Sequence, residues 1–209
     1  MERPLRADAQ RNRERILEVA AKAFAQHGVE ASLEEIARQA GVGVGTLYRH
    51  FPNRDLLVEA VFRRNVDQLV ASADRLLETL SPVEALAQWM REFVEYVSAK
   101  RGLASHLKTV VSAESDLFVS THERMNAAIG RLVDAAVAEG SIRPDVAAPD
   151  VLRAMAGVCM TSDLPGGEEQ ACRISALFMD GLKYGCPGSA SKPASGARRQ
   201  RLASSRAHG

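Results

Sequence analysis

Residues 32–50 carry two helical segments of about two turns each, separated by a short turn that contains glycine. The first begins at Ser32, where the run Ser-Leu-Glu-Glu predicts a capping box in which Glu35 reaches back toward the Ser32 backbone. Gly41 ends this segment, and the second runs over Val44–His50. Helices this short need a neighbour to pack against. The pattern therefore predicts a helix-turn-helix unit braced by a longer helix before it.

Apolar residues at helical spacing predict helices along most of the chain. The bracing helix covers residues 9–27, and Gly28 ends it. After the short pair, Asn53 can cap a fourth helix that continues toward Leu80. Gly102 is expected to break the next helix. The remaining predicted helices cover residues 82–101, 103–110, 116–139, 149–161 and 168–184. The sequence therefore predicts an all-α fold of about nine helices.

Composition narrows the class of protein further. Aromatic residues make up 5% of the chain while helix-forming residues are plentiful, which favours an all-α fold. No apolar run is long enough to span a bilayer, and the charged start lacks the apolar stretch of a secretory signal. Cys159, Cys172 and Cys186 are an odd number without close pairing, which indicates a reducing compartment. We therefore expect a soluble cytoplasmic protein with no membrane partner, metal site or cofactor.

The net charge of +1 gives no case for nucleic-acid binding by itself, so any such case depends on where particular charges lie. Five arginines crowd the first fifteen residues, and a basic arm of this kind can lie along phosphates or enter a minor groove. A solvated, disordered leader is the simpler interpretation of the same residues.

The second segment of the short pair has an unusual surface for a helix in water. Only Leu47 and the following Phe51 are suited to a protein core, so most of the other side chains face outward. They are small, hydroxyl-bearing, aromatic or basic, and none is acidic. Small residues let a helix approach base edges, while hydroxyl and imidazole groups can donate to phosphate oxygens. A structural protein could use the same unit as plain packing, but this surface favours DNA binding in the major groove.

The run from Ala31 to Leu57 resembles the DNA-binding domain of the tetracycline-repressor (TetR) family. Its most specific part is Gly45-Thr-Leu-Tyr-Arg-His-Phe51. The resemblance implies that five side chains contact phosphates, one of them at a position where the family usually has a lysine (Arg54): Ser32, Thr46, Tyr48, His50 and Arg54. Base readout would come from Val42, Gly43, Val44 and Gly45, with a contribution open to Arg49. Few polar groups stand in that stretch, so hydrogen-bonded readout is limited.

The resemblance is weaker after about residue 60, and it implies three parts. Residues 1–60 would form an N-terminal arm and helix-turn-helix DNA-binding domain, residues 61–184 a helical ligand-binding and dimerisation domain, and residues 185–209 a disordered tail. The run Phe178-Met-Asp-Gly-Leu182 is similar to the last helix of the C-terminal type found in many actinobacterial members. The last two predicted helices carry more apolar residues than one core face needs. We therefore expect a homodimer that pairs these helices in a four-helix bundle.

Large and polarizable side chains gather on several predicted helices of the C-terminal half. Such residues can line an adaptable apolar cavity in which a few polar groups orient a ligand. The resemblance implies a small-molecule site there, for which the candidate residues are Trp89, Met90, Phe93, Val97, His106, Phe118, His122, Met125, Met155 and Cys159. An ordinary helical core has the same composition, and the spacing alone favours that interpretation.

No set of residues in the sequence matches a catalytic motif. The glycines of Gly41-Val-Gly-Val-Gly45 lie in a turn between helices and lack the spacing of a phosphate-binding loop. We therefore expect no enzyme, but a one-component transcription regulator, most simply a repressor released from a palindromic double-stranded DNA operator by a small-molecule effector. The alternatives left open are transcription activation, an enzyme with an accessory DNA-binding module, and an architectural DNA protein without a ligand pocket.

Overall fold

The computed structural model describes residues 3–110, 116–160 and 167–184, and this part of the chain folds into helices and short turns without any strand. The all-α prediction is confirmed. The helices are α1 (Arg3–His27), α2 (Leu33–Gln39), α3 (Val44–His50), α4 (Arg54–Thr79), α5 (Pro82–Val110), α6 (Asp116–Glu139), α7 (Ala148–Met160) and α8 (Gly167–Tyr184). None of them is both long and apolar enough to cross a membrane.

The described helices number eight rather than about nine because Gly102 does not end α5, so the predicted break there is wrong. An interior glycine costs a helix only about 0.5–1 kcal/mol relative to alanine. Leu103, the next residue, is almost fully buried, and its packing against the core offsets a cost of this size. No proline or capping residue directly follows Gly102, so the glycine is not supported by a second signal that would end the helix.

The first helix also begins earlier than expected. We predicted a solvated, disordered leader before a helix that begins at about residue 9. α1 already starts at Arg3, so the predicted disorder is wrong for residues 3–8, although Ala7 and Asp8 are solvent-exposed. Pro4 stands in the first turn, where its missing N–H would have no partner in any case. The residues that follow contain no glycine or second proline to stop the helix. The predicted disordered tail at residues 185–209 lies outside the described residues.

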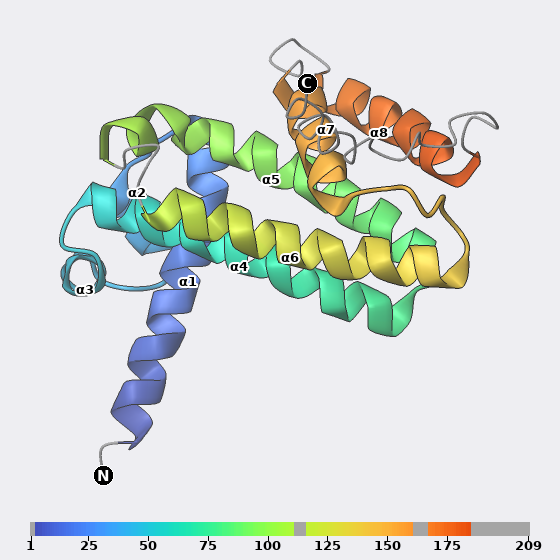
Figure 1. The fold of residues 1–209 in the computed structure, drawn as a ribbon. Helices are drawn as coiled ribbons and strands as arrows, with labels where there is room; N and C mark the ends of the chain where they lie inside the picture. The colour runs from blue at the N-terminus through green and yellow to red at the C-terminus, as the bar shows by residue number, and fades with distance from the viewer. Residues whose placement is uncertain (1–2, 111–115, 161–166, 185–209) are drawn as a thin grey trace, which may run out of the picture.

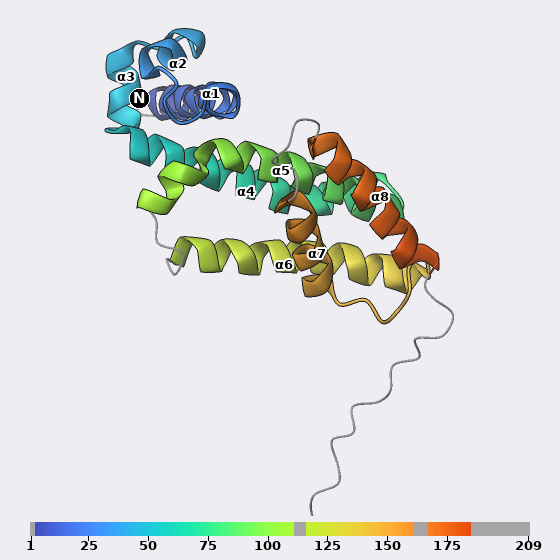
Figure 2. The same ribbon diagram turned by 90° about the horizontal axis from the view of Figure 1, so that it is seen from above.

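The first three helices form a compact unit at one end of the molecule (Figures 1 and 2). α2 packs on both α1 and α3, and α1 also contacts α3 directly. The contacts bury one apolar face of α1, at Ile16, Ala20 and Phe24, together with Ile36 of α2 and Leu47 of α3. A seven-residue helix is too short to be stable alone, so α2 and α3 depend on this shared core.

The long helices α4, α5 and α6 make up the body of the C-terminal half. α4 and α5 lie side by side in both views, and α6 packs against each of them. α7 and α8 pack on α5, and α7 also packs on α6, at the end away from α3 (Figure 2). α4 runs without a break across the predicted domain boundary at residue 60. The two parts of the chain therefore share one helix.

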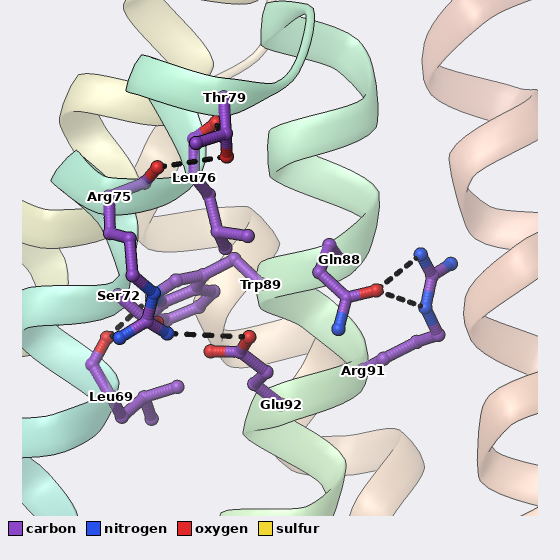
Figure 3. A network of polar contacts seen from close by, with 9 residues as sticks. All are labelled: Leu69, Ser72, Arg75, Leu76, Thr79, Gln88, Trp89, Arg91 and Glu92. Carbon is purple, nitrogen blue, oxygen red and sulfur yellow. Dashed lines mark hydrogen bonds and ion pairs between the residues drawn. The ribbon is translucent and has the colours of Figure 1, made fainter.

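A cluster of polar contacts joins α4 to α5 (Figure 3). The indole Nε1 of fully buried Trp89 donates to the Leu69 carbonyl oxygen at 2.9 Å, and the Ser72 hydroxyl donates to the same oxygen at 2.9 Å. Nearby, Arg75 of α4 lies 3.9 Å from the Glu92 carboxylate of α5. A buried indole N–H is costly unless it is bonded, so Trp89 fixes how far α5 can slide along α4.

Two ion pairs hold α6 to the other side of α4. Arg124 lies 2.7 Å from Asp67, and Arg131 lies 2.7 Å from Asp74. The two arginines are about two turns apart on α6, and so are the two aspartates on α4. Each pair is solvent-exposed and contributes little alone, but the matched spacing fixes the register between the helices.

Candidate nucleic-acid interface

The N-terminus of α2 is capped by Ser32, although the full capping box does not form. The Glu35 N–H donates to the Ser32 hydroxyl oxygen at 3.2 Å, as predicted. The Glu35 carboxylate, however, does not reach back to the Ser32 backbone. It accepts instead from Arg38 at 2.7 Å and from Gln39 at 2.6 Å, one turn farther along. A charged and a neutral side-chain donor on the same helix face outcompete the backbone amide for this carboxylate.

These contacts hold the pKa of Glu35 at about 2, first through the hydrogen bond from Arg38 and then through that from Gln39. The carboxylate is therefore ionised at neutral pH and offsets the charge of Arg38. The positive charge of Arg49 on α3, by contrast, has no acid on its own helix, because the sequence of α3 contains no Asp or Glu. The potential around α3 is thus more favourable to a phosphate than that around α2.

The turn between α2 and α3 depends on Gly41, whose φ of +64° lies in the left-handed region. A side chain at this position would be strained and would also meet the guanidinium of Arg15, which reaches over from α1. The predicted end of α2 at Gly41 is confirmed. This tight turn sets the angle at which α3 leaves α2.

The surface of α3 divides as the sequence predicts. Leu47 is 0% exposed and Phe51, the C-cap residue, is 2% exposed, so both are core anchors. Val44 and Tyr48 are the exposed large apolar side chains of this helix, at 38% and 41%. Gly45 and Arg49 are also exposed, and the half-buried residues are Thr46 and His50. The outward face is therefore small, hydroxyl-bearing, aromatic and basic.

The other predicted DNA-binding residues flank α3. Ser32 and Gly43 are exposed, while Val42 is half-buried against the core. The Ser32 hydroxyl donates to the Glu34 carboxylate at 2.9 Å while it caps α2. Gly43 is the N-cap of α3 and has no side chain with which to cap it. The first turn of α3 therefore begins with backbone N–H groups that no side chain of the cap residue covers.

Arg54 has a structural contact that sequence reasoning missed. Its guanidinium Nη1 donates to the Ala31 carbonyl oxygen at 2.7 Å and also to the Val29 carbonyl oxygen. Arg54 thereby ties the start of α4 to the segment that joins α1 to α2. The partners are separated by more than twenty residues in sequence, so no local pattern could have indicated the bond.

Two further contacts brace the start of α4 and the end of α3. Asn53 caps α4 as predicted, since its side-chain oxygen accepts from the Leu56 N–H at 2.9 Å. Arg13 of α1 places its guanidinium carbon 5.0 Å from the centre of the Phe51 ring. Sequence reasoning assigned Arg13 only to a basic arm. A cation over an aromatic face is attractive, so Arg13 helps to hold the end of α3 against α1.

Most of the candidate ligand-binding residues lie in the core of the C-terminal half. Trp89, Met90, Met155 and Cys159 are almost completely buried, as are Phe93 and Met125, and the half-buried ones are Val97 and Phe118. The Phe93 ring stacks on Trp89 with centroids 5.7 Å apart. His122 is exposed on α6, and the side chain of His106 lies outside the described residues. The structure thus brings most of this set together, with His122 apart from it.

Hollows on the described surface include three whose linings contain none of the candidate ligand residues. One of about 700 Å³ lies between α1 and α4 next to Phe51. A second, of about 550 Å³, lies where α1, α4 and α5 meet. The third, of about 500 Å³, lies between α7 and α8 and includes Val151, Leu177 and Phe178.

Two polar groups in the C-terminal half were not singled out by the sequence. The side-chain oxygen of Asn126 is the one buried polar side-chain atom without a hydrogen-bond partner in the described structure, while its amide nitrogen donates to the His122 carbonyl at 3.0 Å. Lys100 of α5 lies half-buried beside aromatic rings from α4 and α6. Neither residue stands in a recognisable motif, so only the packing of the helices identifies them.

Two family models match the chain, one in each half. Residues 16–61 match the model of bacterial regulatory proteins of the tetR family. Residues 81–184 match the model of the C-terminal domain of SbtR-like transcriptional regulators. Curated relatives include HTH-type transcriptional regulators of Staphylococcus aureus, which are 47% identical over 64 residues. That match covers 30% of this chain and 35% of those relatives' length.

Solved structures extend the similarity to most of the chain. A TetR transcriptional regulator from Streptomyces coelicolor is 43% identical, with a TM-score of 0.75, and the match covers 82% of this chain and 98% of the other. A TetR transcription regulatory protein from Mycobacterium vanbaalenii is 38% identical, with a TM-score of 0.69, over 86% and 99% of the two chains. The similarity therefore includes both the α1–α3 unit and the helices that follow it.

Proposed function

The chain belongs to the TetR family of DNA-binding transcription regulators, which are not enzymes, and we propose that it is a repressor released from a palindromic operator by a small molecule. The observation that carries this proposal is the surface of α3. Its exposed face has no acid and is anchored from behind by Leu47 and Phe51. Such a helix can enter a major groove without moving its core residues.

Contacts with the operator follow from this surface. Tyr48, Thr46 and His50 carry groups that donate to phosphate oxygens, and they would position α3 on the duplex. The stretch from Val42 to Gly45 would lie nearest the base edges, where valine methyl groups can contact a thymine methyl. Ser32, Arg49 and Arg54 stand at the margins of the same surface. Domain boundaries at residues 60 and 184 remain part of this proposal, with α4 shared by both domains.

Dimerisation through α7 and α8 would give the protein the two-fold symmetry that matches a palindromic operator. Met160 and Leu177 are 79% and 72% exposed, and Leu177 borders the hollow of about 500 Å³ between these helices. Single exposed apolar side chains are ordinary on a protein surface, so the support for an interface is the hollow that Leu177 lines together with Phe178 and Val151. A two-fold symmetric pair would place two copies of α3 about 34–36 Å apart, which is one turn of the duplex.

Ligand control would pass through α4. Arg54 fixes the start of α4 to the segment before α2, while Leu69 receives the Trp89 indole farther along the same helix. A ligand that binds better when α4 is tilted shifts the dimer toward a wrong spacing of the two α3 helices. The unpartnered Asn126 oxygen supports a polar ligand in this half, because a buried acceptor without a donor is costly.

A selection from random duplex DNA tests the proposal. The full-length protein should enrich palindromic sites whose half-site centres are about 10 bp apart or a multiple of that spacing. A reporter gene placed behind the enriched site then shows repression or activation. Metabolite fractions are finally tested for release of the labelled site in a gel shift. Failure to enrich any palindrome would contradict the operator, reporter activation would contradict repression, and a site that no fraction releases would contradict ligand control.

A further inference from the structure

Lys100 lies between three helices of the C-terminal half. Its Nζ is 5.3 Å from the centre of the Phe118 ring of α6 and 5.7 Å from the centre of the Phe62 ring of α4. The two rings meet edge to face, with centroids 5.6 Å apart. Phe62 is almost fully buried and Phe118 is half-buried. The ammonium group therefore stands over aromatic faces from two helices, at the side of the core.

No carboxylate of the described residues lies within ion-pair distance of this ammonium group. Burial lowers the pKa of Lys100, as expected when water is removed from a charge and no anion replaces it. Attraction to the rings returns only part of that cost. Because no described carboxylate neutralises the ammonium group, an added negative charge is favoured beside it.

Other basic residues of the same half are exposed and bonded to polar side chains. Arg124 and Arg131 lie on the surface with aspartate partners at 2.7 Å, and Arg91 is exposed and bonded to Gln88. A lysine that only covered apolar surface would extend its ammonium group into water. Lys100 instead keeps its charge against rings that belong to α4 and α6. Simple coverage of the core does not require this arrangement.

We propose that Lys100 binds the acidic group of the effector, and that the effector is an organic acid with an apolar body. This inference rests on the proposed function, since it assigns a chemical class to the ligand of that regulator. The acid supplies a counterion to Lys100, which has none among the described residues, and the apolar body packs beside Phe118. A carboxylate or sulfonate satisfies the ammonium donors better than a neutral hydroxyl does.

The position of Lys100 also links the ligand to DNA. Phe62 follows Arg54 by eight residues on α4, which is about 12 Å along the helix axis. An anion that draws the ammonium group from the rings weakens the attraction that joins α5 to this part of α4. The start of α4, held by Arg54 to the Ala31 carbonyl, then moves relative to α3. A neutral ligand of the same shape lacks this effect.

Two fluorescent probes with one ring skeleton test the proposal. Anilinonaphthalene sulfonate carries the anion, and phenylnaphthylamine is its neutral counterpart. Binding of each is titrated to full-length wild type and to the variants Lys100→Gln, Lys100→Arg and, as a matched loss of charge on the exposed face of α5, Arg91→Gln. Circular dichroism and melting temperature establish that each variant is folded.

Lys100→Gln should bind the sulfonate about ten-fold more weakly, which corresponds to about 1.4 kcal/mol, while its affinity for the neutral probe stays within about two-fold. Lys100→Arg should retain most of the sulfonate affinity, and Arg91→Gln should match the wild type. Equal loss of both probes in folded Lys100→Gln, or no loss of the sulfonate, would overturn the site. Operator release is scored separately, so a charge-selective site that leaves DNA bound contradicts ligand control without contradicting the role of Lys100.

Discussion

Some residues in this protein have structural roles that cannot be inferred from their neighbours in sequence. Arg54 stands beside the helix-turn-helix, where a phosphate contact is expected, yet its guanidinium already bonds the Ala31 and Val29 carbonyls. A guanidinium has five N–H donors, so these bonds and a phosphate contact are compatible. Arginine at this position can therefore both hold the unit together and touch DNA.

Replacing Arg54 distinguishes its structural bonds to the backbone from a contact with DNA phosphate. Arg54→Ala should lower the free energy of unfolding by about 1–3 kcal/mol, because two carbonyl oxygens lose a charged donor. If the residue also touches a phosphate, the slope of log affinity against log salt falls by about one unit per subunit, or about two for the dimer. Thermal melts and operator titrations at several salt concentrations measure both quantities. A lower melting temperature with an unchanged slope would contradict the phosphate contact and leave only the structural tie.

Lys100 makes the affinity for an anionic ligand depend on pH. Burial places the pKa of Lys100 below its ordinary value of 10.5. The anion prefers the ammonium form, so binding of anilinonaphthalene sulfonate is fully present below the pKa of Lys100 and declines as the pH rises through it. The sulfonate itself stays ionised throughout. Lys100→Arg, whose charge persists, should show a flat profile over the same range, and a wild-type profile equally flat would contradict the assignment.

At the scale of the helix, local signals were reliable where a residue and its partner are close in sequence. Asn53 caps α4, and Gly41 ends α2, as the sequence predicts. One error occurred where packing overrides a local signal. Gly102 lies inside α5 because its neighbour Leu103 is buried. The capping box failed for a different reason, because Glu35 bonds a competing local partner, Arg38. Core anchors Leu47 and Phe51 were predictable from periodicity, whereas the Arg54 and Lys100 contacts depend on distant elements.

A substitution of Phe93 on α5 can show whether the candidate ligand residues form a packed core or line a cavity. Its side chain is buried and stacks on Trp89 at 5.7 Å, which is the environment of a core residue. Phe93→Ala should therefore cost about 3–5 kcal/mol of stability. Operator affinity, measured below the melting temperature, should remain near that of the wild type because α5 lies outside the α1–α3 unit.

Val97→Ala, at a half-buried position one turn away, serves as the smaller truncation on the same helix. It should lose less stability than Phe93→Ala, since fewer buried atoms are removed. A Phe93→Ala variant as stable as the wild type would show instead that the ring borders an existing cavity. Loss of response to an effector in that variant would then place Phe93 in the ligand site.

At the scale of the whole molecule, the proposed function requires two chains to bind one operator. Met160 of α7 and Leu177 of α8 are exposed, and α8 lies at the end of the molecule away from α3 (Figure 2). A dimer formed there keeps both DNA-binding units free to reach successive grooves. Small rotations at this interface change the separation of the two α3 helices.

Leu177→Glu tests this interface. A charge at the centre of an apolar contact should shift the chain to monomers in sedimentation, with little change in helix content. Val119→Glu supplies the control, because Val119 is also exposed but lies on α6. The monomeric variant should bind a palindromic site far more weakly than the dimer, since it loses the second half-site. Dimers that persist in Leu177→Glu would show that the chains pair through another surface.

Variants of Tyr48 show by their operator affinity whether the exposed face of α3 binds operator DNA. This side chain is 41% exposed, whereas the neighbouring Leu47 is buried and anchors the helix. Removal of the Tyr48 side chain should therefore leave the fold intact. Fluorescence anisotropy with a selected palindromic duplex should show about ten-fold weaker binding for Tyr48→Ala, which corresponds to about 1.4 kcal/mol for the dimer, or about 0.7 kcal/mol per subunit. Tyr48→Phe should show a smaller loss confined to the hydroxyl. Wild-type affinity in a folded Tyr48→Ala dimer would contradict this role of α3.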